Sequence, residues 1–451
     1  MSRRSPNDRL SALLAEADWS AGELARAVNR LGAAQSLTLR YDRTSVAHWL
    51  SGSKPREAVV ALVAAAFCRR LGRFVTVEDT GLDHSAPEPG LRRPGKERET
   101  TSLARLVILT RADASPERRS LLMRSPYRVE AVPSPDWQPQ PSWIPVPGAR
   151  HRATQEDVRA MRSFSETVAA QLERFGGRHG RSALVAYLAD DVSRVLTASA
   201  PDLLRRTLLV SAAQLTQLLA MMTEDAGCHG LAQIYYHVAL DLARDSGNAV
   251  AYGLVLRAMS VQALQMDHPR RALELAQSAV DVSGSSAHGA ALAFLLSQQA
   301  VTHAYDGQRH AAIRDLVVAE ASLERASNVP GPFTAYPRAG LEYQRAQALL
   351  ALRLPVEALS SLRDSARHRD SERRRTSALT EFRLGEVLMA MGHLEEACVH
   401  WNRFLDHCLY LHSARVDQSL AQLHQMLRPH QRQRHASSVW ERICELIAHP
   451  A

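Results

Sequence analysis

The sequence predicts an all-helical protein, and three observations support this class. Alanine and leucine are abundant, whereas aromatic residues make up only 5% of the 451 residues, a composition that favours helices. Apolar residues recur along most of the chain with the spacing of amphipathic helices. Beyond about residue 205 the pattern repeats roughly every 40 residues. We therefore expect a small helical domain in residues 1–82, a proline-rich linker in 83–153 and a stack of helical repeats in 154–451.

The first predicted domain begins with two helices. In residues 8–17 the apolar side chains fall on one stripe, which consists of Leu10, Leu13, Leu14 and Ala17. Ser20 and Glu23 have the spacing of a capping box, so the second helix should begin at about residue 21. Its buried face should contain Leu24, Ala25 and Val28. A further apolar helix over residues 58–71 completes a compact unit of about four helices.

A short helix within residues 42–52 separates apolar from polar side chains. Val46, Trp49 and Leu50 fall on one stripe, and the opposite side carries Thr44, Ala47, His48 and Ser51. Gly52 should end this helix because glycine readily adopts a left-handed conformation. A small polar face on a helix anchored by tryptophan suits the major groove of DNA. The alternative is an ordinary surface helix.

This polar face provides a set of candidate DNA contacts. Thr44, Ser45 and His48 would face base edges, and Arg43 would either join them or contact phosphate. The DNA backbone would be held by Arg40, Lys54 and Arg56. Because a single helix of this size reads only a few base pairs, we expect a homodimer on double-stranded DNA.

The net charge is concentrated in the first third of the chain. Residues 1–150 hold 23 basic and 16 acidic side chains, which accounts for +7 of the total of +8. Neutralisation of DNA phosphates would require such an excess at one end of the molecule only. The alternative is that these charges merely keep this end in solution.

The predicted linker is rich in proline. Eleven of the 21 prolines lie in residues 86–150, and residues 133–147 contain one at nearly every second or third position. Such a segment should be extended and act as a semi-rigid spacer, although it could also be a peptide ligand for another domain. Two short helices should interrupt it, at about residues 102–110 and after residue 115.

The repeating units each combine two helices and a turn, and a non-repeating bundle is the alternative. The turns fall at about residues 227, 267, 307, 354 and 392. If the units stack, their first helices line a concave groove. Its inner face should contain Gln217, Met221, Arg257, Val261, Ser297, Val301, Tyr343, Gln347, Phe382 and Glu386.

This mixture of amide, apolar and charged groups suits an extended peptide or a small partner helix. The groove could equally be filled by the chain's own linker or carboxyl-terminal helices. Two final helices, at about residues 416–427 and 437–447, should cap the open end of the stack.

The order of the first helices, with Leu24-Ala25 in the second and Trp49 before Gly52, resembles the helix-turn-helix domain of XRE (lambda-repressor-like) regulators. One departure is the segment over residues 30–41, which is far longer than the tight turn usual in that family. The later units resemble tetratricopeptide repeats, somewhat lengthened. The combination is similar to peptide-responsive bacterial regulators, which implies a signal peptide or partner protein in the groove. Asparagines often clamp the peptide in that family, and none occurs at the predicted inner positions.

Three phrases resemble a group of actinomycete transcriptional regulators related to a negative regulator of sporulation and antibiotic production. They lie at residues 43–52, 175–179 and 229–236. The resemblance covers most of the chain and implies transcriptional control, with repression of development or secondary metabolism.

The residues do not predict an enzyme, a cofactor or a metal site, because no spacing of Ser, His, Asp or Cys indicates one. The odd number of scattered cysteines suggests reduced thiols at Cys68, Cys228, Cys398, Cys408 and Cys444. The absence of a membrane-spanning run and of a signal-peptide core predicts a cytoplasmic protein. The competing hypothesis is an interaction scaffold whose repeats recruit a partner protein and whose first domain does not read DNA.

Overall fold

The computed structural model confirms the predicted all-helical class. Apart from one isolated bridge between Arg152 and Ser199, every regular element in the described part of the chain is a helix. Among the helices of the described residues, none is both long and apolar enough to cross a membrane. The structure describes residues 6–34, 37–71, 75, 78–82, 101–129, 132, 152–287, 289–326, 336–370 and 372–448.

The contacts divide the chain into two compact units. The first comprises Met1–Glu99 and Ser115–Pro126, and the second comprises Thr100–Ala114 and Tyr127–Ala451. The chain therefore passes from one unit to the other three times. The two short helices expected in the linker are present, α5 (Ser102–Ala114) in the second unit and α6 (Pro116–Leu122) in the first. The proline-rich residues 133–147, predicted to be extended, lie outside the described residues.

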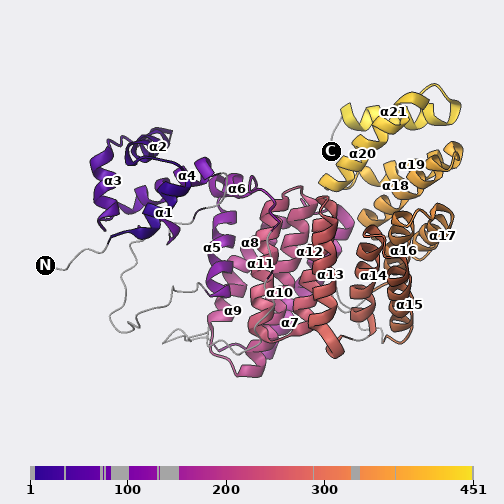
Figure 1. The fold of residues 1–451 in the computed structure, drawn as a ribbon, viewed down its shortest axis with the longest axis horizontal. Coiled ribbons are helices and arrows are strands. Elements are labelled where there is room, and N and C mark those ends of the chain that lie inside the picture. The colour runs from indigo at the N-terminus through magenta and orange to yellow at the C-terminus, as the bar shows by residue number, and fades with distance from the viewer. Residues whose placement is uncertain are drawn as a thin grey trace. The chain divides into compact units, whose positions relative to one another are not determined.

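The first unit packs its helices around an apolar core. Its other elements are α1 (Asp8–Glu16), α2 (Ala21–Ala34), α3 (Arg43–Leu50), α4 (Glu57–Leu71) and a 3₁₀ turn η1 (Glu78–Thr80) (Figure 1). The predicted apolar stripes of α1 and α2 are buried in this core. Ser20 and Glu23 form the predicted capping box, because the Ser20 N–H donates to Glu23 Oε2 at 2.8 Å and the Glu23 N–H donates to Ser20 Oγ at 3.3 Å. These hydrogen bonds hold the pKa of Glu23 below its usual range.

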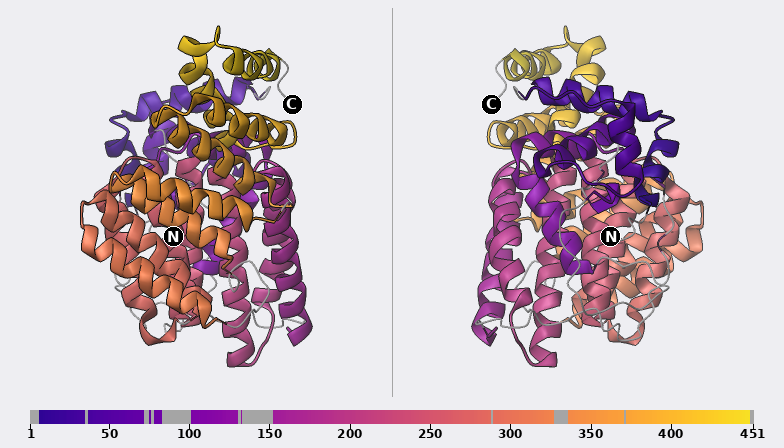
Figure 2. Two further views of the ribbon diagram at one scale, coloured as in Figure 1. Left: turned by 90° about the vertical axis from the view of Figure 1, so that its right-hand side faces the viewer. Right: turned by 90° about the vertical axis from the view of Figure 1, so that its left-hand side faces the viewer.

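The second unit is built mainly from helical hairpins. It begins with α7 (Gln155–Phe175), α8 (Arg181–Tyr187), the π-helical η2 (Leu188–Val192) and α9 (Ser193–Thr197). The hairpins in the described residues are α10 (Asp202–Asp225) with α11 (His229–Ser246), α12 (Ala249–Gln265) with α13 (Pro269–Ser283), α14 (Gly289–Tyr305) with α15 (Arg309–Glu324), α16 (Arg338–Ala351) with α17 (Pro355–Arg367), and α18 (Arg374–Ala390) with α19 (Leu394–Cys408). Helices α20 (Ala414–Leu427) and α21 (Arg434–Ala448) follow. Figures 1 and 2 show successive hairpins side by side from magenta to orange, so the predicted repeats are confirmed.

A residue with positive φ lies in the turn of each hairpin, at the predicted positions. The φ angles are +88° at Gly227, +61° at Asp267, +76° at Gly307, +61° at Arg353 and +87° at Gly392. This left-handed conformation ends the first helix and reverses the chain. Glycine adopts it without strain, whereas the Cβ of an arginine makes it unfavourable.

Buried charges anchor α5 to the second unit. The guanidinium of Arg181 donates to both carboxylate oxygens of Asp113, through Nη1 at 3.1 Å and through Nη2, and its Nε donates to Thr223 Oγ1 at 2.8 Å. The Tyr235 hydroxyl also donates to Asp113, at 2.6 Å. Both charged side chains are almost completely buried. A buried ion pair with this many hydrogen bonds is geometrically specific, so α5 has a defined position on the second unit.

Candidate functional site

Helix α3 presents the polar face that its sequence predicts. The apolar stripe is buried at Val46 and Trp49, and Leu50 is partly buried. The exposed side carries Arg43, Thr44, Ala47 and His48. The separation of the two sides follows from the 3.6-residue period of the helix. Helix α3 therefore holds a small polar surface rigidly, because its opposite side is fixed in the core.

Ser45 differs from the prediction that it faces DNA bases. It is only partly exposed, and its hydroxyl donates to Asp42 Oδ1 at 2.8 Å. Its backbone N–H donates to the same oxygen at 2.8 Å, and the Asp42 N–H donates to Ser45 Oγ at 3.3 Å. These bonds form a capping box and hold the pKa of Asp42 below its usual range. Ser45 therefore helps to cap the start of α3, and the exposed polar face consists of its neighbours.

The long connection between α2 and α3 is pinned by one amide side chain. Helix α2 continues to Ala34, so part of the predicted loop over residues 30–41 is helical. The Asn29 side chain donates to the Tyr41 carbonyl at 2.8 Å and accepts from the Tyr41 N–H at 3.0 Å. The Tyr41 ring meets the Trp49 ring edge-on, with centroids 5.1 Å apart. These contacts fix the start of α3 against α2 despite the long connection.

The end of α3 is closed by a left-handed glycine, as predicted. Gly52 has a φ of +94°, and the hydroxyls of Ser51 and Ser53 both donate to the His48 carbonyl, the first at 2.9 Å. The predicted backbone-holding residues Arg40, Lys54 and Arg56 are exposed. Basic side chains therefore precede and follow the polar face along the chain.

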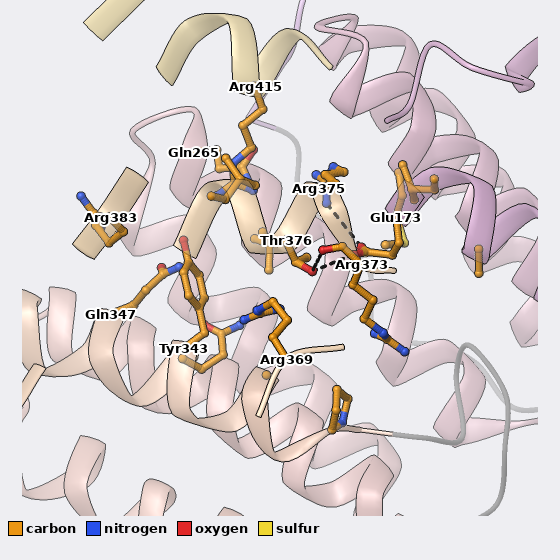
Figure 3. Close-up of a pocket in the computed structure, with 18 of the residues that line it drawn as sticks. Glu173, Gln265, Tyr343, Gln347, Arg369, Arg373, Arg375, Thr376, Arg383 and Arg415 are labelled. Atoms are coloured by element: carbon orange, nitrogen blue, oxygen red, sulfur yellow. Dashed lines mark hydrogen bonds and ion pairs between the residues drawn. The ribbon is translucent and has the colours of Figure 1, made fainter. Parts of the chain in front are cut away.

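A pocket of about 1330 Å³ lies within the second unit. Its walls come from the first helices of the hairpins, α10, α12, α14, α16 and α18, and from α7 and α20. We call this pocket the repeat groove; the predicted inner residues that line it are Met221, Arg257, Val261, Tyr343, Gln347, Phe382 and Glu386. Figure 3 shows Tyr343, Gln347 and several arginines directed into it. Helix α20 thus borders the groove as well as following the last hairpin.

Gln217, Ser297 and Val301 are predicted on the inner face but do not line the groove. All three are almost fully buried. The Gln217 amide donates to the Leu254 carbonyl at 3.2 Å, which joins α10 to α12. The Ser297 hydroxyl lies 3.0 Å from the Tyr336 hydroxyl. The first helices of neighbouring hairpins pack against each other along their sides. Only the residues in the middle of each helix's inner face therefore line the groove.

The loop after α7 contacts the segment before α20. The His412 N–H donates to the Phe175 carbonyl at 2.7 Å, and the Arg178 N–H donates to the His412 carbonyl at 3.1 Å. Gly176 has a φ of +86°, and a Cβ there would come within 2.7 Å of the His412 carbonyl oxygen. The segment over residues 175–179 therefore needs its glycine to join the two ends of the second unit.

Asp225 is the centre of this junction. Its buried carboxylate accepts from the Gly177 N–H at 2.7 Å, from Arg375 Nε at 2.7 Å and from the Ser413 hydroxyl at 2.9 Å. Arg375 also lies 3.7 Å from Glu173 (Figure 3). One side chain thus connects α10, α18 and the segments next to α7 and α20, which closes the wall of the groove.

Residues 10–83 match the family model of the SP15 N-terminal domain, which spans the helices from α1 to α4 and η1. No curated protein matches the sequence. Among solved structures, the chain is similar to one described as the crystal structure of the APC/C hetero-tetramer Cut9-Hcn1. That comparison has a TM-score of 0.36 and 13% sequence identity, and it covers 96% of this chain and 68% of that chain.

Glutamines form a large part of the groove that sequence reasoning missed. The lining includes Gln171, Gln265, Gln298, Gln344, Gln347, Gln418 and Gln422, of which only Gln347 was predicted. An amide side chain offers a donor and an acceptor, and one that is not already paired within the chain can pair with a peptide group. The spacing of Gln344 with Gln347 and of Gln418 with Gln422 places each pair on one helix face, which is the signal that could have found them.

The groove also contains more basic than acidic side chains. Its arginines are Arg174, Arg257, Arg369, Arg373, Arg375, Arg383 and Arg415, and its carboxylates are Glu166, Glu173, Asp370, Glu372 and Glu386. Arg375 pairs with Asp225, and Arg383 lies 2.8 Å from Glu386. No three His, Cys, Asp or Glu side chains in the described residues gather closely enough to bind a metal ion. The groove can therefore bind anions and amide groups through its own side chains.

A side recess of about 380 Å³ is lined by Glu224 among others, and it shares Arg257, Gln265 and Arg415 with the groove. Glu224 accepts from the Tyr236 hydroxyl at 2.7 Å. In the orientation that satisfies both ends of its amide, Gln265 donates to Glu224 Oε1 at 3.0 Å and accepts from Arg415 at 3.0 Å. Burial raises the pKa of Glu224 to about 7. This carboxyl therefore exchanges its proton near neutral pH.

Proposed function

We propose that the protein is a sequence-specific DNA-binding transcriptional regulator whose repeat groove binds a partner. The observation that carries the proposal is the exposed polar face of α3. Thr44 and His48 extend from a helix that Trp49 fixes in the core, so they can meet base edges in a major groove. Exposed basic residues on both sides of this face would contact the phosphates.

The direction of control and the state of assembly are part of the same proposal. The resemblance of residues 43–52, 175–179 and 229–236 to actinomycete XRE-type regulators supports a repressor of development or secondary metabolism. A homodimer in the cytoplasm is the expected form, because one short helix covers only a few base pairs and a second copy doubles the site.

The test is selection of genomic DNA fragments by the purified full-length protein at about physiological salt. The wild type should enrich fragments that share a motif, and a Thr44→Ala/His48→Ala double variant should lose that motif. His310→Ala, at an exposed histidine of α15, is the control and should keep it. Weak, sequence-blind binding that is unchanged in the double variant would refute the proposal.

A second experiment separates base reading from phosphate binding. His48→Ala should relax sequence preference, whereas Lys54→Ala should weaken binding to every sequence and flatten the dependence of affinity on salt. Fluorescence anisotropy with a selected fragment and a scrambled fragment, repeated at several salt concentrations, measures both effects. Equal losses on both fragments for both variants would contradict this division of roles.

The size and polarity of the repeat groove favour a second candidate, an interaction scaffold whose first unit does not read DNA. Under that hypothesis the protein would still bind a partner through the groove, but fragment selection would return no motif. The two candidates are therefore distinguished by DNA selection alone, whatever the groove binds.

A further inference from the structure

We infer that the occupant of the repeat groove is an extended acidic peptide segment, whose carboxylates are received by Arg257, Arg369 and Arg415. This inference rests on the partner-binding part of the proposed function and names the chemistry of the partner. It follows from three properties of the groove: arginines without acidic partners, amides along the walls, and a volume too large for a small ion.

The three arginines differ from the others of the groove in their partners. Within the part of the chain that the structure describes, none of them has a carboxylate at ion-pair distance. Arg257 Nε donates to the Phe294 carbonyl at 3.1 Å, and its guanidinium lies 3.5 Å from the centre of the Phe294 ring. Arg369 donates to the Ser365 hydroxyl at 2.7 Å, and Arg415 donates to the amide oxygen of Gln265 at 3.0 Å. Neutral acceptors hold these guanidinium groups in place, and the carboxylates that act on them, Glu173 on Arg369 and Glu224 on Arg415, do so without forming an ion pair.

Burial makes the lack of a counter-charge consequential. The pKa values of Arg257 and Arg369 are both lowered because burial disfavours their charged forms, to about 10 for Arg257. Arg369 Nε is buried without a hydrogen-bond partner among the described residues. A carboxylate placed beside Arg369 would accept this donor and supply the missing charge. The groove is thus electrostatically complementary to an anion.

The remaining wall indicates a peptide rather than an isolated carboxylate. Glutamines from α7, α16 and α20 can pair with successive peptide groups. Phe294, Tyr343 and Phe382 offer apolar contacts between them. The volume of about 1330 Å³ exceeds the roughly 300–1,000 Å³ of typical small-molecule sites. An extended chain can reach several walls of such a groove at once.

The test measures binding of two fluorescent pools of capped peptides, about ten residues long, to the full-length protein. One pool carries glutamate at two fixed positions and the other carries glutamine there, with Ala, Leu, Ser and Gln varied elsewhere. At about physiological salt the glutamate pool should bind about tenfold more tightly or better. Capping both ends of the peptides leaves the side-chain carboxylates as their negative charges.

Arg369→Gln and Arg415→Gln should each reduce the preference for the glutamate pool, and Arg309→Gln, at an exposed position of α15 outside the groove, should not. Thermal unfolding of each variant checks its fold, and Arg415→Gln, on α20, is the variant that we expect to fold normally. Binding of neither pool, equal binding of both pools, or an unchanged preference in both groove variants would overturn the inference. Competition by citrate as strong as by the glutamate pool would assign the site to a small anion instead and also overturn it.

The outcome is independent of DNA reading. The groove variants should select the same DNA fragments as the wild type when no peptide is added, because the groove lies within the second unit. A failure of DNA selection with an intact preference for the glutamate pool would retain the peptide site and remove the regulator. The reverse result would retain the regulator and remove the peptide site.

Discussion

The polar face of α3 and the repeat groove are held in place in opposite ways. All candidate DNA contacts fall within residues 40–56, and the side-chain hydrogen bonds at the start of α3 join residues at most 12 positions apart, as between Asn29 and Tyr41. At the end of α3 one backbone bond reaches further, because the Asn7 N–H donates to the Leu50 carbonyl at 2.8 Å. The groove is lined by residues from 166 to 422, and the Asp225–Ser413 bond at its junction spans 188 positions. The polar face of α3 therefore depends on contacts at the ends of its helix, whereas the repeat groove depends on the contact between the two ends of the second unit.

The largest effect is expected for Asp225→Ala, which removes the centre of the junction. Of the two ion pairs that Arg375 makes in the described part of the chain, the one with Glu173, at 3.7 Å, would remain. Removing one member of a buried ion pair costs about 3–5 kcal/mol, so the second unit should be destabilised by that amount. Hydrogen exchange measured by mass spectrometry should show faster exchange in α7, α18 and α20, with α2 and α3 unchanged.

Asp364→Ala is the matched control, because Asp364 pairs with Arg367 one turn away on the same helix. Such exposed pairs contribute roughly 0–1 kcal/mol. If Asp225→Ala were no more harmful than this control, closure of the groove would not depend on the junction and the contrast between the two sites would disappear.

A pH effect of intermediate size is expected from Glu224. Its pKa is raised from 4.5 to about 7, so between these values the folded protein holds a proton that the unfolded chain releases. The resulting stabilisation, on the order of 3 kcal/mol, is complete below about pH 4.5 and is lost as the pH rises through about 7. Denaturant unfolding of the wild type and Glu224→Gln between about pH 5 and 8 measures it. The free energy of unfolding of the wild type minus that of Glu224→Gln should decrease as the pH rises, because only the wild type loses a proton at this position. A value that stays constant with pH would contradict the titration of Glu224.

Asp42→Ala tests the local kind of support. It removes both hydrogen bonds that the Asp42 carboxylate accepts from Ser45, so the first turn of α3 should fray. Exchange of the first α3 amides should accelerate several-fold and affinity for a selected DNA fragment should fall, with no change in the repeat hairpins. Asp42→Asn can still accept a hydrogen bond from Ser45, so it should retain most of the protection of the α3 amides and most of the DNA affinity. Faster exchange throughout the first unit would show that the support is not local.

The smallest effect is expected for Arg353→Gly. Arg353 has a φ of +61° in the turn between α16 and α17, where glycine has no Cβ to strain. The substitution should stabilise the second unit by about 0.5–1 kcal/mol. Arg353→Ala keeps the Cβ and should give no such gain, so thermal unfolding of the two variants separates backbone strain from loss of the arginine side chain.

The difference between the sites also explains what could be predicted from the sequence. The faces of α3 follow from a period of 3.6 residues, and Trp49 and His48 lie on the predicted sides. The sequence did not predict that the Ser45 hydroxyl donates to Asp42, because a spacing rule contains no side-chain rotamer. The repeat turns were predicted because each hairpin is a local unit.

The groove was predicted only in part, because its side walls depend on how successive hairpins pack. The helical period places Gln217 near the inner stripe, but the neighbouring helix α12 covers it through Leu254. The contribution of α20 comes from the contact of residue 412 with the loop after α7, over more than two hundred positions. No local pattern in the sequence contains such a pairing.

The chain passes from one unit to the other three times, and this determines which fragment of the chain can contain the first unit alone. Cutting the chain before residue 100 leaves α6 behind, although its Leu122 is fully buried and Leu121 packs on the core of the first unit. Extending the fragment to residue 126 recovers α6 but brings α5 with it. Asp113 would then carry its charge without Arg181. A shortened gene product therefore either lacks one of its own helices or carries a helix that belongs to the other unit.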